Sequence, residues 1–116
     1  MKSLLINFLF NALLLYSSPF NLNEITAEAV VLAIANEDFT LVNEAFDKRL
    51  LNPNEIYNGK PLLLHAIDQD NAEMVRLLIS RGARLNYVDA AGYNPKEYAR
   101  IHNKIYALAE IIVITA

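Results

Sequence analysis

Apolar residues follow helical spacing in several stretches of the chain, and the same pattern returns with a 33-residue period. Met74, Val75, Leu78 and Ile79 stand at i, i+1, i+4 and i+5, a spacing that places them in one stripe along a helix. A period of this size indicates stacked helical units, each of which buries its apolar face against the next. The positions that the period links are Ala33, Ala66 and Ala99; Val42, Val75 and Leu108; Ala45, Leu78 and Ile111; Phe46, Ile79 and Ile112; and Gly59 and Gly92.

The predicted helices are clearest in the middle unit. Pro61 sets up a helix over 62–67, which a run of polar residues then ends. Asn71 is placed to N-cap a second helix over about 72–81. Gly82 follows as the expected C-terminal cap, because glycine adopts a positive φ without a Cβ penalty.

The units on either side repeat this logic. Asn94 and Pro95 occupy the N-cap and first helical positions of the third unit, whose second helix is expected from about Lys104. Asp38 stands one period before Asn71 and is expected to serve the same N-cap role in the first unit. The alanine that all three first helices share predicts close packing between adjacent helices, where a larger side chain would not fit.

Composition allows one globular domain. The chain has 116 residues, 54% of them hydrophobic and 20% charged. A net charge of -3 argues against a nucleic-acid partner, which would favour a basic face. Acidic residues gather over 19–58, where they either steer a basic partner or form a solvated face. With no cysteine, the chain has no disulfides, thiolate metal sites or cysteine nucleophiles.

Residues 1–18 combine Lys2 with an apolar run over 4–16, a pattern typical of a secretory signal peptide. The run is shorter than the roughly 20 residues that a membrane span needs. Because Asn7 and Asn11 interrupt it, a helix capping the first unit is an alternative, and a membrane anchor is a third. A signal peptide would make the protein secreted or periplasmic, and without one we expect it to be cytoplasmic. Membrane contact is expected only if the segment is retained.

The second and third units share a motif as well as a period. The second contains Gly59-x-x-Leu62-Leu63-x-x-Ala66 and Gly82-Ala83-x-Leu85-Asn86-x-x-Asp89, and the third begins with Gly92-x-Asn94-Pro95-x-x-x-Ala99. This pattern resembles the ankyrin repeat, with its Gly-x-Thr-Pro-Leu-His-x-Ala and Gly-Ala-x-Val-Asn-x-x-Asp segments. The resemblance implies an all-α fold, a short ankyrin-like solenoid of helix-turn-helix repeats within 19–116. Its units would span about 24–55, 56–88 and 89–116.

Catalytic and metal chemistry has few candidate residues. His65 and His102 are the only histidines, and a metal site would need a third ligand such as Asp68 or Asp70. A polar rim of a groove is the favoured interpretation of these side chains. Because phosphate loops, nucleophile elbows and paired-carboxylate motifs are missing from the sequence, we expect no enzymatic activity, no metal and no cofactor.

The ankyrin resemblance implies a concave surface made by loop tips and the exposed side of each first helix. It would bind a protein partner of unknown identity, with Tyr57, Lys60 and Tyr93 as anchors. Tyr87 and Tyr93 have a second interpretation, in which they only cover apolar surface between loops. The whole expected surface comprises Tyr57, Asn58, Lys60, Asp68, Gln69, Ala90, Ala91, Tyr93, Ile101 and His102.

An alternative function is structural. The chain would then be an assembly piece that stacks end to end through its apolar termini, including Val113 and Ile114. These two residues either pack under the third unit or form a contact surface. The sequence leaves the oligomeric state open.

Overall fold

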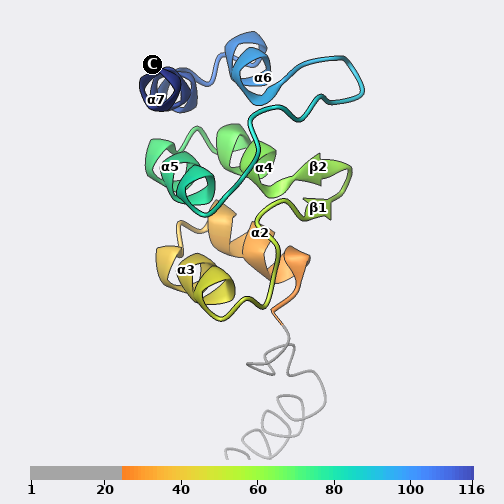
Figure 1. Ribbon diagram of the computed structural model, residues 1–116, viewed down its shortest axis with the longest axis vertical. Helices are drawn as coiled ribbons and strands as arrows, with labels where there is room; N and C mark the ends of the chain where they lie inside the picture. The colour runs from red at the N-terminus through yellow and green to blue at the C-terminus, as the bar shows by residue number, and fades with distance from the viewer. Residues whose placement is uncertain (1–24) are drawn as a thin grey trace, which may run out of the picture.

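The computed structural model describes residues 25–116, so the signal peptide or capping helix expected over 1–18 lies outside the described residues. The described part is mostly helical, as the sequence predicts, and its helices follow one another in pairs (Figure 1). The first pair is α2 (Ala27–Ala35) and α3 (Phe39–Asp47), the second is α4 (Leu62–Asp68) and α5 (Ala72–Ser80), and the third is α6 (Pro95–Ile101) and α7 (Ile105–Thr115). A short hairpin of β1 (Ile56–Tyr57) and β2 (Lys60–Pro61) precedes the second pair.

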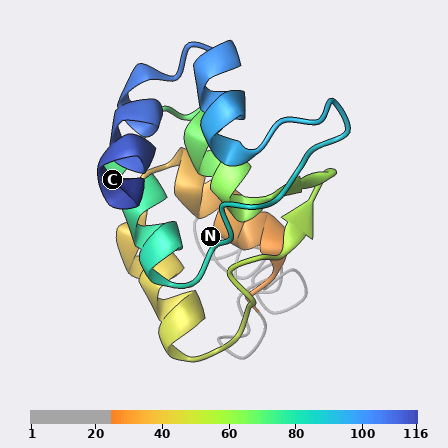
Figure 2. The same ribbon diagram turned by 45° about the horizontal axis from the view of Figure 1, so that its top comes forward.

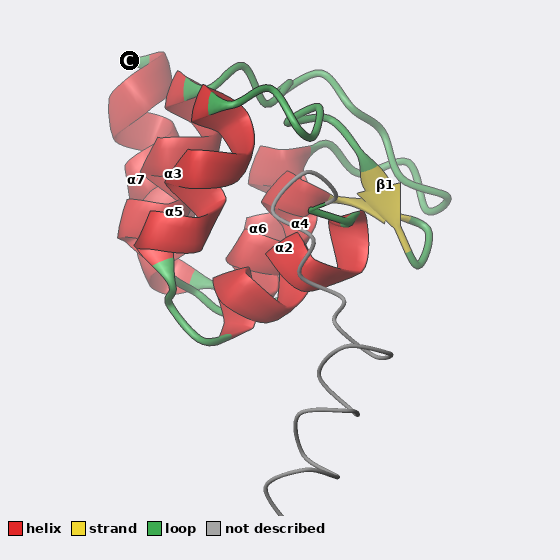
Figure 3. Ribbon diagram, turned by 90° about the horizontal axis from the view of Figure 1, so that it is seen from below, coloured by secondary structure: helices red, strands yellow, loops and turns green. Residues whose placement is uncertain are grey.

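The helix pairs stack in chain order and form two layers. The first helices of the pairs, α2, α4 and α6, lie in one layer, and α3, α5 and α7 lie in the other (Figure 3). Within the first layer α4 packs against both α2 and α6, and in the second layer α5 packs closely on α7. The hairpin and the loop that precedes α6 project from the side of the first layer (Figures 1 and 2).

The 33-residue period is a property of the backbone as well as of the side chains. The second helices begin at Phe39, Ala72 and Ile105, and the first helices end at Ala35, Asp68 and Ile101. The turn inside each pair has a residue of positive φ at the same place: Glu37, Asp70 and Asn103. The turn inside each pair therefore has the same left-handed backbone conformation at the equivalent residue in all three pairs.

The C-terminal caps of α3 and α5 also correspond. Gly82 has φ +105°, as the sequence predicts for a glycine cap, and Arg49 takes φ +53° at the equivalent position of the first pair. The backbone N–H of Gly82 donates to the carbonyl of Ile79, and that of Arg49 donates to the carbonyl of Phe46. The first pair thus keeps the turn although a side chain with a Cβ tolerates this conformation less well than glycine.

The core lies between the two layers and between successive pairs. The shared alanines, Ala33, Ala66 and Ala99, are buried, which confirms the predicted close packing. In α4 the side chains of Leu62, Leu63, Leu64, Ala66 and Ile67 are all buried. A helix that is apolar on nearly every side is stable only when other elements surround it, as α2, α5 and α6 surround α4.

The hairpin is a feature that the helical pattern of the sequence does not predict. Ile56 pairs with Pro61 and Tyr57 with Lys60 in antiparallel register. Asn58 and Gly59 form the tip with φ +52° and +77°, and Asn-Gly is the dipeptide that best tolerates positive φ at two successive turn positions. Within the described residues, strand pairing is confined to this hairpin.

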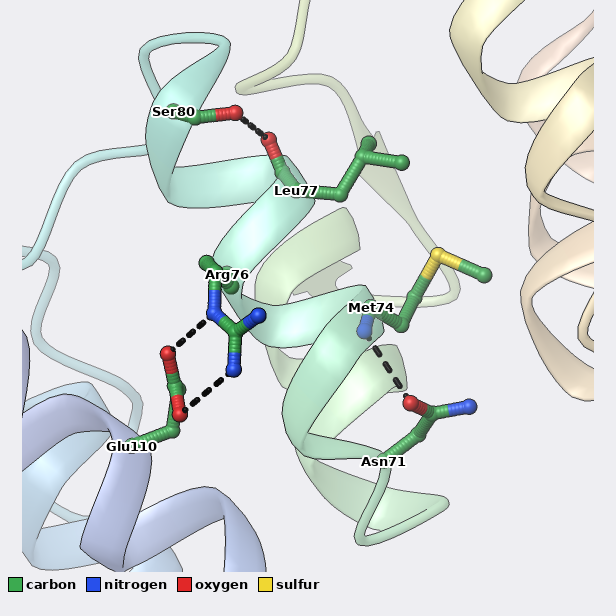
Figure 4. A network of polar contacts seen from close by, with 6 residues as sticks. All are labelled: Asn71, Met74, Arg76, Leu77, Ser80 and Glu110. Atoms are coloured by element: carbon green, nitrogen blue, oxygen red, sulfur yellow. Dashed lines mark hydrogen bonds and ion pairs between the residues drawn. The ribbon is translucent and has the colours of Figure 1, made fainter.

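Side-chain caps begin three of the helices where the sequence predicts them. The Oδ1 atoms of Asp38, Asn71 and Asn94 accept hydrogen bonds from backbone N–H groups three residues later, which confirms all three N-caps (Figure 4 shows that of Asn71 with Met74). Helix α7 differs, because Lys104 stands at its N-cap and a lysine side chain has no acceptor. Asp70 of the preceding pair supplies the missing acceptor, since its Oδ1 lies 2.9 Å from the backbone nitrogen of Ala107.

A salt bridge fastens α5 to α7. The Arg76 guanidinium donates to both carboxylate oxygens of Glu110, with Nε–Oε1 and Nη2–Oε2 distances of 2.6 and 3.2 Å (Figure 4). The hydrogen bond to Arg76 lowers the pKa of Glu110, and the same bond raises the pKa of Arg76. The Arg76 side chain is 61% exposed to solvent, while that of Glu110 is only 14% exposed, so solvent screens the pair on one side and its contribution to stability is modest.

We predict that Ala66→Leu destabilises the protein by about 1–3 kcal/mol, because the added methyl and methylene groups have no space between α4 and its neighbours. Urea unfolding followed by circular dichroism measures the effect. Ala35→Leu is the matched control, since Ala35 is exposed near the end of α2. Equal stability of the two variants would contradict close packing at Ala66.

We predict that Asp70 and Lys104 are coupled through the N-terminus of α7. In an Asp70→Ala background, Lys104→Asn supplies a local cap and should recover about 1 kcal/mol of unfolding free energy. In the parent chain the same substitution should gain much less, because the Ala107 N–H is already bonded. A double-mutant cycle in urea cancels any strain at the positive φ of residue 70. Additive effects would show that Asp70 does not cap α7.

Candidate binding surface

The ten residues of the predicted surface come from the hairpin, from the C-terminal ends of α4 and α6, and from the loop before α6. The structure places four of them half-buried and six exposed. The half-buried ones are Tyr57, Lys60, Asp68 and Tyr93, and the exposed ones are Asn58, Gln69, Ala90, Ala91, Ile101 and His102. The hairpin and the helix ends are joined by polar contacts. The loop before α6 is held by hydrogen bonds within the loop itself.

Asp68 is the junction of this surface. Its Oδ2 accepts a hydrogen bond from Lys60 Nζ, which ties the hairpin to the far end of α4. Its Oδ1 accepts from the Tyr98 hydroxyl at 2.6 Å, which ties α4 to α6. Burial raises the pKa of the Tyr98 hydroxyl, and the hydrogen bond to Asp68 raises it further. Tyr98 therefore stays protonated and acts as a donor across the neutral pH range.

The two histidines have separate partners. His65 Nε2 lies 2.8 Å from the backbone carbonyl of Tyr57 and donates to it, so the imidazole supports the hairpin. The ring of His102 packs on that of Tyr98, with 4.2 Å between ring centroids. Across residues 25–116, no group of three or more acidic or histidine side chains is placed to hold a metal ion.

The loop before α6 is organised by Asp89. Its Oδ1 accepts hydrogen bonds from the backbone N–H groups of Ala91 and Tyr93, at 3.0 and 2.8 Å. Its own N–H donates to the carbonyl of Tyr93 at 3.0 Å, and the N–H of Gly92 donates to the Asp89 carbonyl. The loop tip that contains Ala90 and Ala91 is thus held by side-chain and backbone hydrogen bonds, whereas the hairpin is held by pairing of its strands.

The loop tyrosines Tyr87 and Tyr93 are partly buried. Tyr87 and Tyr93 pack against the core, so their rings do cover apolar surface, as the second interpretation of them requires. Tyr87 also reaches the hairpin, with 3.5 Å between its hydroxyl and the carbonyl of Gly59. Tyr93 remains half-exposed and can contribute to a contact as well as to the core.

Two residues that organise the surface were not among the predicted ones. Tyr98 stands one period after His65, and the repeat register, which places the two side chains at equivalent points of adjacent helices, is the signal that identifies it. Asp89 was noted only as part of a motif. Its position four residues before Tyr93, at a loop with Gly92, is typical of an aspartate that bonds to its own turn.

Apolar side chains at the end of α7 are exposed. Val113 keeps 71% of its surface exposed, so it does not pack under the third pair, whereas Ile114 keeps 38% and is partly covered. Of the two open interpretations, the structure is consistent with a contact surface. None of the helices within residues 25–116 has the length and apolar character needed to cross a membrane.

Comparisons of the chain with models of known protein families, with curated proteins and with solved structures found no match.

We predict that Tyr98→Phe lowers the unfolding free energy by about 1 kcal/mol, because the substitution removes a hydrogen bond to a charged acceptor and leaves Asp68 with one donor fewer. Thermal or urea denaturation measures the loss. Tyr106→Phe is the control, since the side chain of Tyr106 is largely exposed. If both variants unfold like the parent, the Tyr98–Asp68 bond does not hold α4 to α6.

Proposed function

We propose that this protein is a short ankyrin-like repeat protein that binds another protein through the surface around Asp68. The observation that carries the proposal is the Lys60–Asp68–Tyr98 network, which joins the hairpin, α4 and α6. A surface whose parts are fixed before binding loses less entropy when a partner docks. The proposed surface is the set of ten residues named above.

The chemistry of this surface suits a protein partner. Exposed Gln69 and His102 are adjustable hydrogen-bonding groups at the ends of neighbouring helices, and Ile101 adds apolar area beside them. Tyr93 offers a ring whose base is already held by the core, so little side-chain entropy remains to be lost. Interfaces of moderate affinity combine such apolar anchors with a polar rim.

The proposed role is non-catalytic. His65 donates to a backbone carbonyl, and Asp68 accepts from both Lys60 and Tyr98, so these two candidate groups are engaged in holding the surface together. Residues 1–18 support a secreted or periplasmic protein, because their pattern is that of a signal peptide. The partner would then share that compartment.

The test begins with a photo-crosslinking amino acid placed at Gln69 in the full chain and expressed in the native host. Exposed Ser80 on α5 is the control position, because it lies in the other helix layer. We expect a discrete crosslinked partner from position 69 and none from position 80. Crosslinks of equal yield at both positions would argue against a defined surface.

The partner identified in this way is then purified and its affinity measured against two variants. Tyr93→Ala should weaken binding at least about tenfold, as truncation of a tyrosine anchor does, whereas Tyr106→Ala on α7 should leave it unchanged. Circular dichroism confirms that both variants fold. Unchanged affinity of a folded Tyr93→Ala variant would remove Tyr93 from the surface.

A further inference from the structure

The two ends of the stack expose positions that are in contact inside it. Between the second and third helix pairs, Tyr98 of α6 touches Asp68 of α4. Leu32 stands two periods before Tyr98, at the same point of α2, and Ile101 stands one period after Asp68, at the same point of α6. Both are exposed, at 56% for Leu32 and 44% for Ile101. Leu32 and Ile101 therefore occupy the two positions that contact each other between adjacent pairs inside the stack, and one of them lies at each end.

The second helices show the same relation. Ile112 on α7 is 45% exposed, while Phe46, at the equivalent point of the first pair, is buried. At the other end Leu41 is half-buried, while its equivalent Met74 is fully buried. Each end of the stack therefore has exposed or half-buried apolar residues whose equivalents in another pair are buried by the neighbouring pair.

Charge distinguishes the two ends. A hollow at the α2–α3 end is lined by the carboxylates of Glu28 and Asp38 together with Leu32. A hollow at the α6–α7 end is lined by Lys96 and Arg100, with Glu97, Leu108 and Ile112. The ion pairs found within residues 25–116 use none of Glu28, Asp38, Lys96 or Arg100.

The basic residues occupy positions that belong to the core in the other pairs. Lys96 corresponds to Leu63 and Arg100 to Ile67, both of which are buried inside the stack. An exposed end explains why charged residues are accepted there. It does not by itself explain why both are basic while the opposite end is acidic.

We propose that copies of this chain associate head to tail, the α6–α7 end of one copy docking on the α2–α3 end of the next. This pairing sets Ile101 beside Leu32 and places the basic hollow against the acidic one. Pairing of like ends would bring two acidic or two basic hollows together, and such like-charge contact is unfavourable. The contact uses two different surfaces, so it propagates into an open row of copies unless the rotation closes a ring.

The proposal does not depend on the binding surface around Asp68. It names a second copy as the occupant of the α2–α3 end. Residues 1–24 of the same chain are a competing occupant of that end, because they precede α2 directly.

The absence of cysteine makes a clean test possible. Full-length Leu32→Cys and Ile101→Cys variants are prepared separately, then mixed under mild oxidation and compared with each variant alone. We expect the mixture to form a crosslinked dimer in at least about tenfold higher yield than either variant alone, since only opposite ends attract. Ser80→Cys is the control for random collision and should not crosslink with either variant above background.

Other outcomes overturn the proposal. Equal yields in the mixed and single samples indicate like-end pairing or random contact. A Leu32→Cys variant that resists both crosslinking and a small thiol reagent shows that residues 1–24 cover the α2–α3 end. A mixture that stays uncrosslinked although both thiols react with the reagent shows that the ends do not meet.

Charge reversal gives a second, independent readout. Sedimentation velocity of the full parent chain should show an average mass that rises with protein concentration and falls with added salt. Arg100→Glu should abolish the rise, and mixing it with Glu28→Lys should restore the rise, because every α6–α7 end in the mixture can then meet an α2–α3 end of opposite charge. A parent chain that remains monomeric at every concentration would refute the head-to-tail contact.

Discussion

Burial of α4 between α2 and α6 is the interaction on which the rest of this structure depends. The helix has seven residues, too few to be stable alone, and five of them are buried apolar side chains. Its existence therefore requires both neighbours, and each neighbour in turn buries its own alanine or apolar stripe against it. The three pairs cannot form independently, because separating the middle pair from its neighbours would expose the buried side chains of α4 to water.

The same helix also builds the candidate surface. Its half-buried polar side chains are His65 and Asp68, and each is bonded outside α4: His65 to the backbone of the hairpin, and Asp68 to Lys60 and Tyr98. The packing that surrounds the apolar side of α4 thereby fixes where its polar side meets the hairpin and α6. Rigidity of the surface is a consequence of the core, so we expect substitutions between α4 and α6 to affect both.

Features that depend on neighbouring residues could be read from the sequence, whereas features that depend on the stacking could not. The caps of Asp38, Asn71 and Asn94 involve an N–H three residues away, so composition and spacing sufficed. The Asp70–Ala107 bond joins residues 37 apart and depends on how two pairs stack. Ile112 fits the helical stripe but is exposed, because burial of that stripe needs a following pair that the described chain does not supply.

Of the candidate surface, the exposed tips and helix ends were predictable, but the bonds that hold them were not. Tyr98 and Asp68 are 30 residues apart, and only the adjacency of α4 and α6 brings them together. The Asn-Gly tip was visible in the sequence, but the register of the hairpin also depends on the Tyr57 carbonyl meeting His65.

The differences between equivalent positions show that the pairs are not interchangeable. Leu63 and Ile67 make α4 an interior helix, while Lys96 and Arg100 at the same places of α6 would be costly to bury without partners. The charges of the third pair suit a face exposed to solvent, yet Ile101 and Ile112 are also exposed at the α6–α7 end. A purely solvated cap has no need of such side chains, and an interior face would not carry the two basic ones. An exposed apolar patch beside Lys96 and Arg100, which outnumber the neighbouring Glu97, is instead suited to a face that meets a complementary acidic surface.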